Sequence, residues 1–200
     1  MAKPGDTFEV DVGPFVVDVC RGDLLIEIQT GSFAAMGRKM DALLDEYRIL
    51  LVHPIAVETY LYKPPAKPRK SPKKATVYNI FDELVSFPTL LDNPNLTIEI
   101  LLVSINKHQI ADPTLRRNRG GWRTIDKELR EIKDHLTLSD TCDLLSLLPN
   151  DLPTEFNTHD LSVALKVERR IAQRMTYCLR ALGALEILER NKSGIVYRRN

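Results

Sequence analysis

Two short β-strand patterns near the start of the chain, each with a carboxylate among apolar residues, constrain the fold more than any other feature. Asp18 lies in the apolar run of residues 15–20, and Glu27 lies in that of residues 24–30. Side chains alternate between the two faces of a strand, so Glu27 and Gln29 share one face. The Arg-Gly-Asp sequence between the runs suits a hairpin turn, which predicts that Asp18 lies across from Glu27 or near it.

Two chemical interpretations of this hairpin are open from spacing alone. Carboxylate and amide oxygens are ligands for hard cations such as Mg²⁺, so Asp18, Glu27 and Gln29 are candidate ligands of a divalent metal. Alternatively, they are the polar face of an antiparallel hairpin, because a half-buried strand alternates apolar and polar residues in any case.

The order of these residues resembles the PD-(D/E)XK nuclease superfamily, which has the restriction-endonuclease-like fold. The resemblance is carried by Asp18, by Glu27-x-Gln29 on the next strand, and by the helix and apolar strand that follow. It implies that Asp18 and Glu27 hold Mg²⁺ or Mn²⁺ and that Gln29 occupies the position of the lysine that positions or activates the attacking water. Gln29 departs from the pattern, because an amide lacks the positive charge of lysine.

A lysine from the following helix is recruited in nucleases of this type, which makes Lys39 a further candidate. The alternative for Lys39 is a solvated surface lysine. The superfamily core usually opens with a helix, and only six residues precede Thr7 here. The resemblance covers roughly the first third of the chain.

The start of the chain predicts a small mixed sheet with one helix on it. A first strand is expected before residue 12, ahead of the two carboxylate strands. Ser32 is a candidate N-cap, and the apolar residues between 33 and 47 have helical spacing. Residues 49–52 predict a buried, parallel strand reached through that helix, and residues 57–62 predict another strand. His53 is interpreted as structural.

Three later segments complete the expected first domain. Residues 77–87 predict a short helix, and residues 96–105 are apolar on both faces, as is typical of a strand inside a sheet. Glu99 in that strand is a further carboxylate candidate. An amphipathic helix is predicted over residues 125–136 from the spacing of Ile125, Leu129, Ile132 and Leu136.

Two basic segments are candidates for contacts to phosphate. Residues 63–75 form a Pro/Lys arm, which has four prolines, six basic residues and no acidic residue up to Lys74 and predicts an extended, exposed segment. A solubilising linker is the alternative for the arm. The second segment is a loop with Trp122 as a stacking surface and with Arg116, Arg117 and Arg119 as its candidate DNA-binding residues.

The last sixty residues predict three helices and a hairpin. The helices are expected at residues 139–148, 158–165 and 168–182, and the hairpin at residues 184–199. This order resembles the winged-helix family, which makes the third helix the recognition helix and the hairpin tip the wing. The candidate DNA-binding residues are then Arg169, Arg170, Gln173, Arg174, Arg180 and Lys192. A winged helix used for protein contact is the alternative.

Composition indicates a soluble globular protein in a reducing compartment. Hydrophobic residues make up 44% of the chain and charged residues 28%. The three cysteines are far apart in sequence and form neither a metal-ligand spacing nor a disulfide framework, which favours the cytoplasm. No apolar run is long enough to cross a bilayer, so no membrane partner is expected.

We therefore predict an α+β protein with a mixed-sheet, restriction-endonuclease-like domain (residues 1–136) and a small C-terminal winged-helix domain (residues 137–200). The predicted function is DNA binding with Mg²⁺-dependent hydrolysis of phosphodiester bonds by a deoxyribonuclease. The alternative is a non-catalytic DNA-binding or transcription-regulatory module on a degenerate nuclease fold, so whether the chain is an enzyme is open at this point. DNA is the expected partner, and a homodimer is compatible with the sequence.

Overall fold

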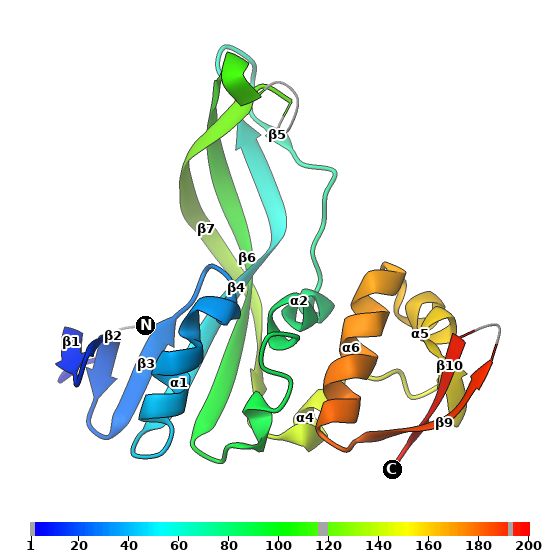
Figure 1. Ribbon diagram of the computed structural model, residues 1–200. Coiled ribbons are helices and arrows are strands. Elements are labelled where there is room, and N and C mark those ends of the chain that lie inside the picture. The colour runs from blue at the N-terminus through cyan, green and yellow to red at the C-terminus, as the bar shows by residue number, and fades with distance from the viewer. Residues whose placement is uncertain (1–2, 116–119, 192–193) are drawn as a thin grey trace. The chain divides into compact units, whose positions relative to one another are not determined.

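The computed structural model describes residues 3–115, 120–191 and 194–200 (Figure 1). The chain is an α+β protein with a mixed sheet of seven strands in the order β1-β2-β3-β4-β6-β7, with β5 paired to β4. Two compact units divide the chain. Unit 1 contains Met1–His53, Tyr78–Ile100 and Thr137–Asn200, and unit 2 contains Pro54–Val77 and Leu101–Leu136. The division into residues 1–136 and 137–200 stays a prediction.

Unit 1 begins with the predicted meander of three antiparallel strands. These are β1 (Thr7–Val12), β2 (Phe15–Arg21) and β3 (Leu24–Ile28), and each pairs with the next. Gly22 adopts a φ of +60° in the turn between β2 and β3, a conformation that glycine reaches without the steric cost of a Cβ. The hairpin prediction is confirmed.

A short helical segment crosses from β3 to the next strand. Ser32 caps it, as predicted, because its Oγ accepts a hydrogen bond from the N–H of Ala34 at 3.3 Å. The segment consists of the 3₁₀ helix η1 (Phe33–Met36) and the helix α1 (Gly37–Leu43). Its predicted apolar stripe is buried at Phe33, Met36, Met40, Leu43 and Leu44.

The strand that follows runs parallel to β3, as predicted, but is longer than expected. β4 (Arg48–Tyr62) is one strand of 15 residues, whereas the sequence predicted two strands separated at Pro54. The main chain of Val52 faces β3, where its carbonyl accepts the N–H of Gln29 at 2.9 Å. Pro54 faces the same side two residues later, beyond the last pair between β3 and β4, so its missing N–H interrupts no pair of that ladder.

Three helical turns precede the central strand. They are η2 (Val77–Ile80), α2 (Phe81–Leu84) and η3 (Leu90–Asp92). The first two lie within the short helix predicted over residues 77–87, whereas η3 was not predicted. The side chains of Ile80, Phe81 and Leu84 are buried. The central strand β6 (Leu96–Ala111) lies between β4 and β7, which confirms the predicted interior strand.

The helix predicted over residues 125–136 is wrong. This segment belongs to β7 (Trp122–Leu138), an edge strand of 17 residues that follows β6 and the 3₁₀ turn η4 (Pro113–Leu115). Its apolar residues do not form a buried stripe, since Ile125, Leu129 and Ile132 are all exposed. Pairing with β6 decides the conformation here, and that pairing is not visible in the local spacing.

In unit 2 the Pro/Lys arm is exposed, as predicted, but it is not extended throughout. Its residues 69–70 form β5 (Arg69–Lys70), which pairs antiparallel with Tyr60 and Leu61 of β4. The described residues of the arm are otherwise in turns or irregular backbone, and most of them are exposed.

The C-terminal part of unit 1 contains the predicted helices and hairpin and one strand that was not predicted. Its helices are α4 (Thr141–Leu145), α5 (Thr158–Leu165) and α6 (Arg169–Ala181). Its strands β8 (Glu155–Asn157), β9 (Leu185–Asn191) and β10 (Gly194–Arg199) form a second sheet in the order β8-β10-β9. We expected a longer first helix, and β8 was missed because it is only three residues long.

Local signals set the ends of two of these helices. Asn157 caps α5 in a capping box with Asp160, directly before the predicted start of this helix at residue 158. Lys166 takes a left-handed conformation in the turn between α5 and α6, and Gly183 does so after α6. Over the described ranges, no helix is long and apolar enough to span a membrane.

Candidate active site

The β2–β3 hairpin brings the two predicted carboxylates together. The pairs of this ladder are Val19 with Ile26 and Cys20 with Leu25, and one further step in the same register places Asp18 opposite Glu27. At that point Asp18 Oδ2 accepts a hydrogen bond from the N–H of Ile28 at 2.7 Å. Directly opposed residues of an antiparallel pair project to the same face, so the two carboxylates share one side of the sheet.

Lys39 of α1 reaches this same side. Its Nζ donates to Glu27 Oε2 at 2.6 Å and to the main-chain oxygen of Val16 at 2.6 Å. The side chains of Lys39 and Glu27 are 15% and 16% exposed, so the ion pair is mostly removed from solvent. Lys39 is therefore bonded to both strands of the hairpin and is not a solvated surface lysine.

Gln29 lies at the end of β3, where its side chain turns toward the following loop. Its Nε2 donates to the main-chain oxygen of Ser32 at 2.9 Å. Its own main-chain oxygen accepts a hydrogen bond from His53 Nδ1 at 2.7 Å, which places the proton of the neutral imidazole on Nδ1. In the structure, Gln29 is thus engaged by the helix cap and by β4.

His53 is a residue near the site for which sequence reasoning gave no such contact. Its ring is buried and meets the Phe33 ring edge to face at 5.0 Å. Burial lowers the pKa of His53 below its ordinary value of 6.5, and the hydrogen bond to Gln29 and the nearby Glu83 carboxylate oppose that shift. Glu83 itself accepts the N–H of Phe33 at 3.0 Å. The parallel β3–β4 pairing is the signal that could have placed His53 beside Gln29.

The donor chemistry of Asp18 and Glu27 fits a hard divalent cation held by two carboxylates. Each carboxylate uses one oxygen in the contacts above, while Asp18 Oδ1 and Glu27 Oε1 make no hydrogen bond to the residues that the structure describes. Within those residues no group of three or more His, Cys, Asp or Glu side chains is arranged to hold a metal. A bound Mg²⁺ would therefore take most of its oxygen ligands from water or from a phosphate, as Mg²⁺ commonly does. Glu99, the other carboxylate candidate, accepts a hydrogen bond from Thr137 Oγ1 at 2.8 Å.

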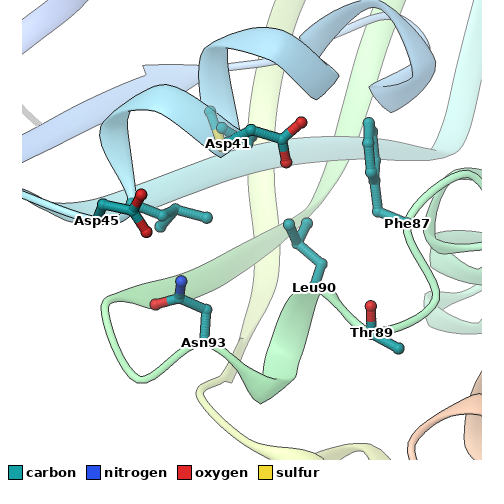
Figure 2. A pocket seen from close by; sticks show the side chains of 8 residues that line it. Asp41, Asp45, Phe87, Thr89, Leu90 and Asn93 are labelled. Atoms are coloured by element: carbon teal, nitrogen blue, oxygen red, sulfur yellow. The ribbon is translucent and has the colours of Figure 1, made fainter.

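The opposite side of α1 borders a shallow hollow of about 260 Å³ (Figure 2). Its polar lining comes from Asp41 of α1, Asp45 after α1, and Thr89 and Asn93 before β6, and the Phe87 and Leu90 side chains supply apolar surface. None of the four predicted site residues lines this hollow. The predicted site thus lies outside this hollow.

Comparison with known proteins gives a family for the segment that contains this site. A family model described as "Domain of unknown function (DUF8091)" matches residues 1–139. The chain belongs to the DUF8091 family. An uncharacterized protein of Treponema pallidum (strain Nichols) is 24% identical over 164 residues, which cover 79% of this chain and 65% of that protein. The chain thus spans less than two thirds of the length of this relative. No solved structure matches the chain significantly.

The DUF8091 match ends before α6, the helix with most of the predicted DNA-binding residues. Two of these are engaged within unit 1. Arg170 Nη1 and Arg174 Nη1 both donate to Asp82 Oδ1 of α2, the latter at 2.6 Å. The Asp82 carboxylate raises the pKa of Arg170.

The other predicted DNA-binding residues are exposed or lie outside the described residues. Arg169 Nε donates to Thr158 Oγ1 at 3.3 Å, and the Arg180 guanidinium lies 5.9 Å from the centre of the Tyr177 ring. Gln173 is exposed between them on α6. The candidates outside the described ranges are Arg116, Arg117, Arg119 and Lys192.

Proposed function

We propose that this chain binds DNA and hydrolyses its phosphodiester bonds with Mg²⁺ or Mn²⁺. The single observation that carries this proposal is the convergence of Asp18, Glu27 and Lys39 on one side of the β2–β3 hairpin. Two carboxylates that are suited to a hard cation, beside one ammonium group, are a donor set suited to phosphate chemistry. The resemblance to PD-(D/E)XK nucleases points to the same residues.

The roles follow from the contacts. Asp18 and Glu27 would hold the metal through the oxygens that are not engaged by Ile28 and Lys39, and a bound Mg²⁺ supplies an activated water and neutralises charge on the phosphate. Lys39 supplies the positive charge that Gln29 lacks. In the reaction a water oxygen bonds to phosphorus and the bond from phosphorus to the leaving sugar oxygen breaks. One water proton passes to that leaving oxygen or to solvent.

The test is cleavage of linear, circular, branched and single-stranded DNA by the full chain in Mg²⁺ or Mn²⁺, with EDTA as the blank. Asp18→Asn is the informative variant, because its amide oxygen can still accept the N–H of Ile28 while the metal-binding charge is lost. Cleavage should disappear in this variant and in Glu27→Gln. It should persist in Arg38→Met, which removes a charge from an exposed position of α1.

The metal has a readout that does not depend on cleavage. Mg²⁺ or Mn²⁺ bound between two carboxylates stabilises the folded state by mass action, so the melting temperature should rise with metal concentration. The double variant Asp18→Asn, Glu27→Gln should lose that rise. The site is refuted if the melting temperature of the native chain does not change with either metal, or if the Asp18→Asn variant still cleaves DNA.

A non-catalytic DNA-binding module is the second candidate function. It is favoured by Gln29, which stands in the lysine position and donates its Nε2 to Ser32 rather than offering a charge. This alternative predicts salt-dependent binding of DNA with no metal-dependent product on any substrate.

A further inference from the structure

The charges of this chain are segregated between its two units. The sequence has 28 Lys and Arg and 27 Asp and Glu. Within Pro54–Val77 and Leu101–Leu136 we count 14 basic and 6 acidic residues, which leaves 14 basic and 21 acidic residues for unit 1. The net charge of +1 therefore conceals a unit 2 of +8 and a unit 1 of −7. A polyanion would be attracted to unit 2 and repelled by the rest of the chain.

One face of unit 2 combines these cations with aromatic rings. Strands β4, β6 and β7 lie side by side there, and β5 pairs with β4 (Figure 1). The guanidinium of Arg130 on β7 lies 4.2 Å from the centre of the Tyr60 ring on β4. Lys70 of β5 approaches the same ring at 5.9 Å, while its Nζ also bonds Glu58.

The same arrangement repeats toward the ends of β4 and β6. Tyr62 stacks on His108 with ring centres 4.7 Å apart and planes inclined by 26°. Lys63 Nζ lies 4.6 Å from the centre of the Trp122 ring. Three aromatic rings thus each have a cation or an imidazole against them, and all three rings are half-buried.

Packing alone does not account for this face. In unit 2 the buried apolar side chains among the described residues are only Ile55 and Val103, so the rings do not cover a substantial core. β7 is exposed along nearly its whole length. Contacts between cations and partly exposed rings are weak, and a phosphate offers the same cations a charge-assisted hydrogen bond.

We propose that this aromatic–basic face binds single-stranded DNA. It is defined by Tyr60, Tyr62, Lys63, Lys70, Trp122 and Arg130. The lysines and Arg130 contact phosphates, and unpaired bases stack on the three rings, since every base offers a π-face irrespective of sequence. The choice of DNA as the ligand rests on the proposed function, whereas the choice of an unpaired strand rests on the three half-buried rings beside the cations.

The chain contains a direct probe of this face, because Trp122 is its single tryptophan. The full chain is titrated in EDTA with a twenty-nucleotide oligothymidylate, while Trp122 emission and the anisotropy of a labelled copy of the oligonucleotide are recorded. We expect Trp122 emission to be quenched along the same binding curve that anisotropy gives. Log affinity should fall linearly with log salt.

Two charge-removing variants on β7 distinguish binding at this face from a non-specific effect of net charge. Arg130→Gln and Lys127→Gln each remove one charge from an exposed residue, but alternation places Lys127 on the other face of the strand. Affinity should fall about tenfold in Arg130→Gln and less than twofold in Lys127→Gln. Tyr60→Leu should lower affinity by about tenfold through lost stacking, with an unchanged salt slope. Circular dichroism melting verifies that each variant is folded.

The result that would overturn the proposal is oligonucleotide binding without quenching of Trp122, or equal losses in Arg130→Gln and Lys127→Gln. A blunt duplex that competes better than the single strand would also overturn it. Failure of the proposed hydrolysis is distinguishable, because binding is measured in EDTA, where metal-dependent cleavage does not contribute. If no DNA is cleaved but Trp122 emission is still quenched by the oligonucleotide, the proposed nuclease activity is rejected and the proposed single-strand-binding face is retained.

Discussion

The ion pair between Lys39 and Glu27 is the contact on which the candidate site depends, and Lys39→Met tests it. Methionine keeps most of the apolar stem of lysine, so packing on the hairpin changes little. The variant removes the ammonium that donates to Glu27 Oε2 and to the Val16 carbonyl, each at 2.6 Å. Glu27 is then left as a mostly buried carboxylate without its cation.

The cost can be bracketed from the exposure of the pair. Exposed ion pairs contribute about 0.2–1 kcal/mol, and removing one partner of a fully buried pair costs about 3–5 kcal/mol. With side chains 15% and 16% exposed, this pair lies between the two limits, so we expect a loss of about 2 kcal/mol. For a chain of this length that corresponds to a fall in Tm of roughly 4–8 °C.

A double-mutant cycle measures the interaction itself. The free energy of unfolding in urea is determined for the native chain, Lys39→Met, Glu27→Gln and the double variant, and we expect a coupling energy of about 1–2 kcal/mol. Arg38→Met is the matched control, because it removes a charge from the neighbouring, exposed position of α1. A coupling energy within error of zero, or equal costs for Lys39→Met and Arg38→Met, would show that Lys39 does not pair with Glu27 in solution.

Three further predictions follow from groups outside that pair. Asp82→Ala should lower the free energy of unfolding by about 1–2 kcal/mol relative to the exposed Asp92→Ala, because Asp82 holds both arginines of α6. Burial lowers the folded-state pKa of His53, so its contribution to stability is complete above about pH 6.5 and is lost as pH falls through that lowered pKa. Between pH 5 and 7 the urea midpoint of the native chain should therefore fall with decreasing pH, and this dependence on pH should be smaller in His53→Gln. Burial raises the pKa of the Cys178 thiol to about 12, so a disulfide reagent at pH 8 should label the exposed Cys142 rapidly and Cys178 only on unfolding.

Much of the N-terminal fold was predictable because its signals are local. Alternation and the turn at Gly22 define the β2–β3 hairpin, and Ser32 marks the start of the helical crossover. A continuous apolar run after a helix implied the buried, parallel strand. These features require only contacts between consecutive elements, which hydrophobic period and capping chemistry specify.

The failures occur where pairing between distant residues overrides the local pattern. The apolar residues of the predicted helix at 125–136 recur every three or four positions, but Ile125, Leu129 and Ile132 are 57%, 63% and 46% exposed in β7. The apolar stripe of an amphipathic helix packs against a neighbouring element. In this segment the backbone forms hydrogen bonds with β6 instead, and these apolar side chains stay exposed. Pro54 likewise predicts the end of a strand, but β4 continues through it because its missing N–H faces the side that β3 no longer occupies.

The residues of the candidate site likewise fall into two groups, those that the sequence places together and those that it does not. Asp18, Glu27 and Lys39 could be placed together from sequence, because a hairpin and the helix that follows it supply all three. The contact of His53 with Gln29 was not predicted, although the predicted parallel pairing of β3 and β4 could have placed these residues side by side. The contact of Glu83 with Phe33 could not be predicted, because it joins segments 50 residues apart and no short-range pattern marks it.

The contacts of α6 restrict how the C-terminal segment can meet DNA. Arg170 and Arg174 are one helical turn apart and share the Asp82 carboxylate, so both guanidiniums are satisfied without a phosphate or a base. The side of α6 with Gln173 is exposed and has no such partner among the described residues. On the proposal that α6 contacts bases, these contacts would start from the Gln173 side, and Arg170 and Arg174 would take part only after their bonds to Asp82 break. To bind these two arginines, DNA phosphates would have to interact with them more favourably than the Asp82 carboxylate does through its charge-assisted hydrogen bonds. This competition favours the cations of unit 2 as the proposed first point of contact.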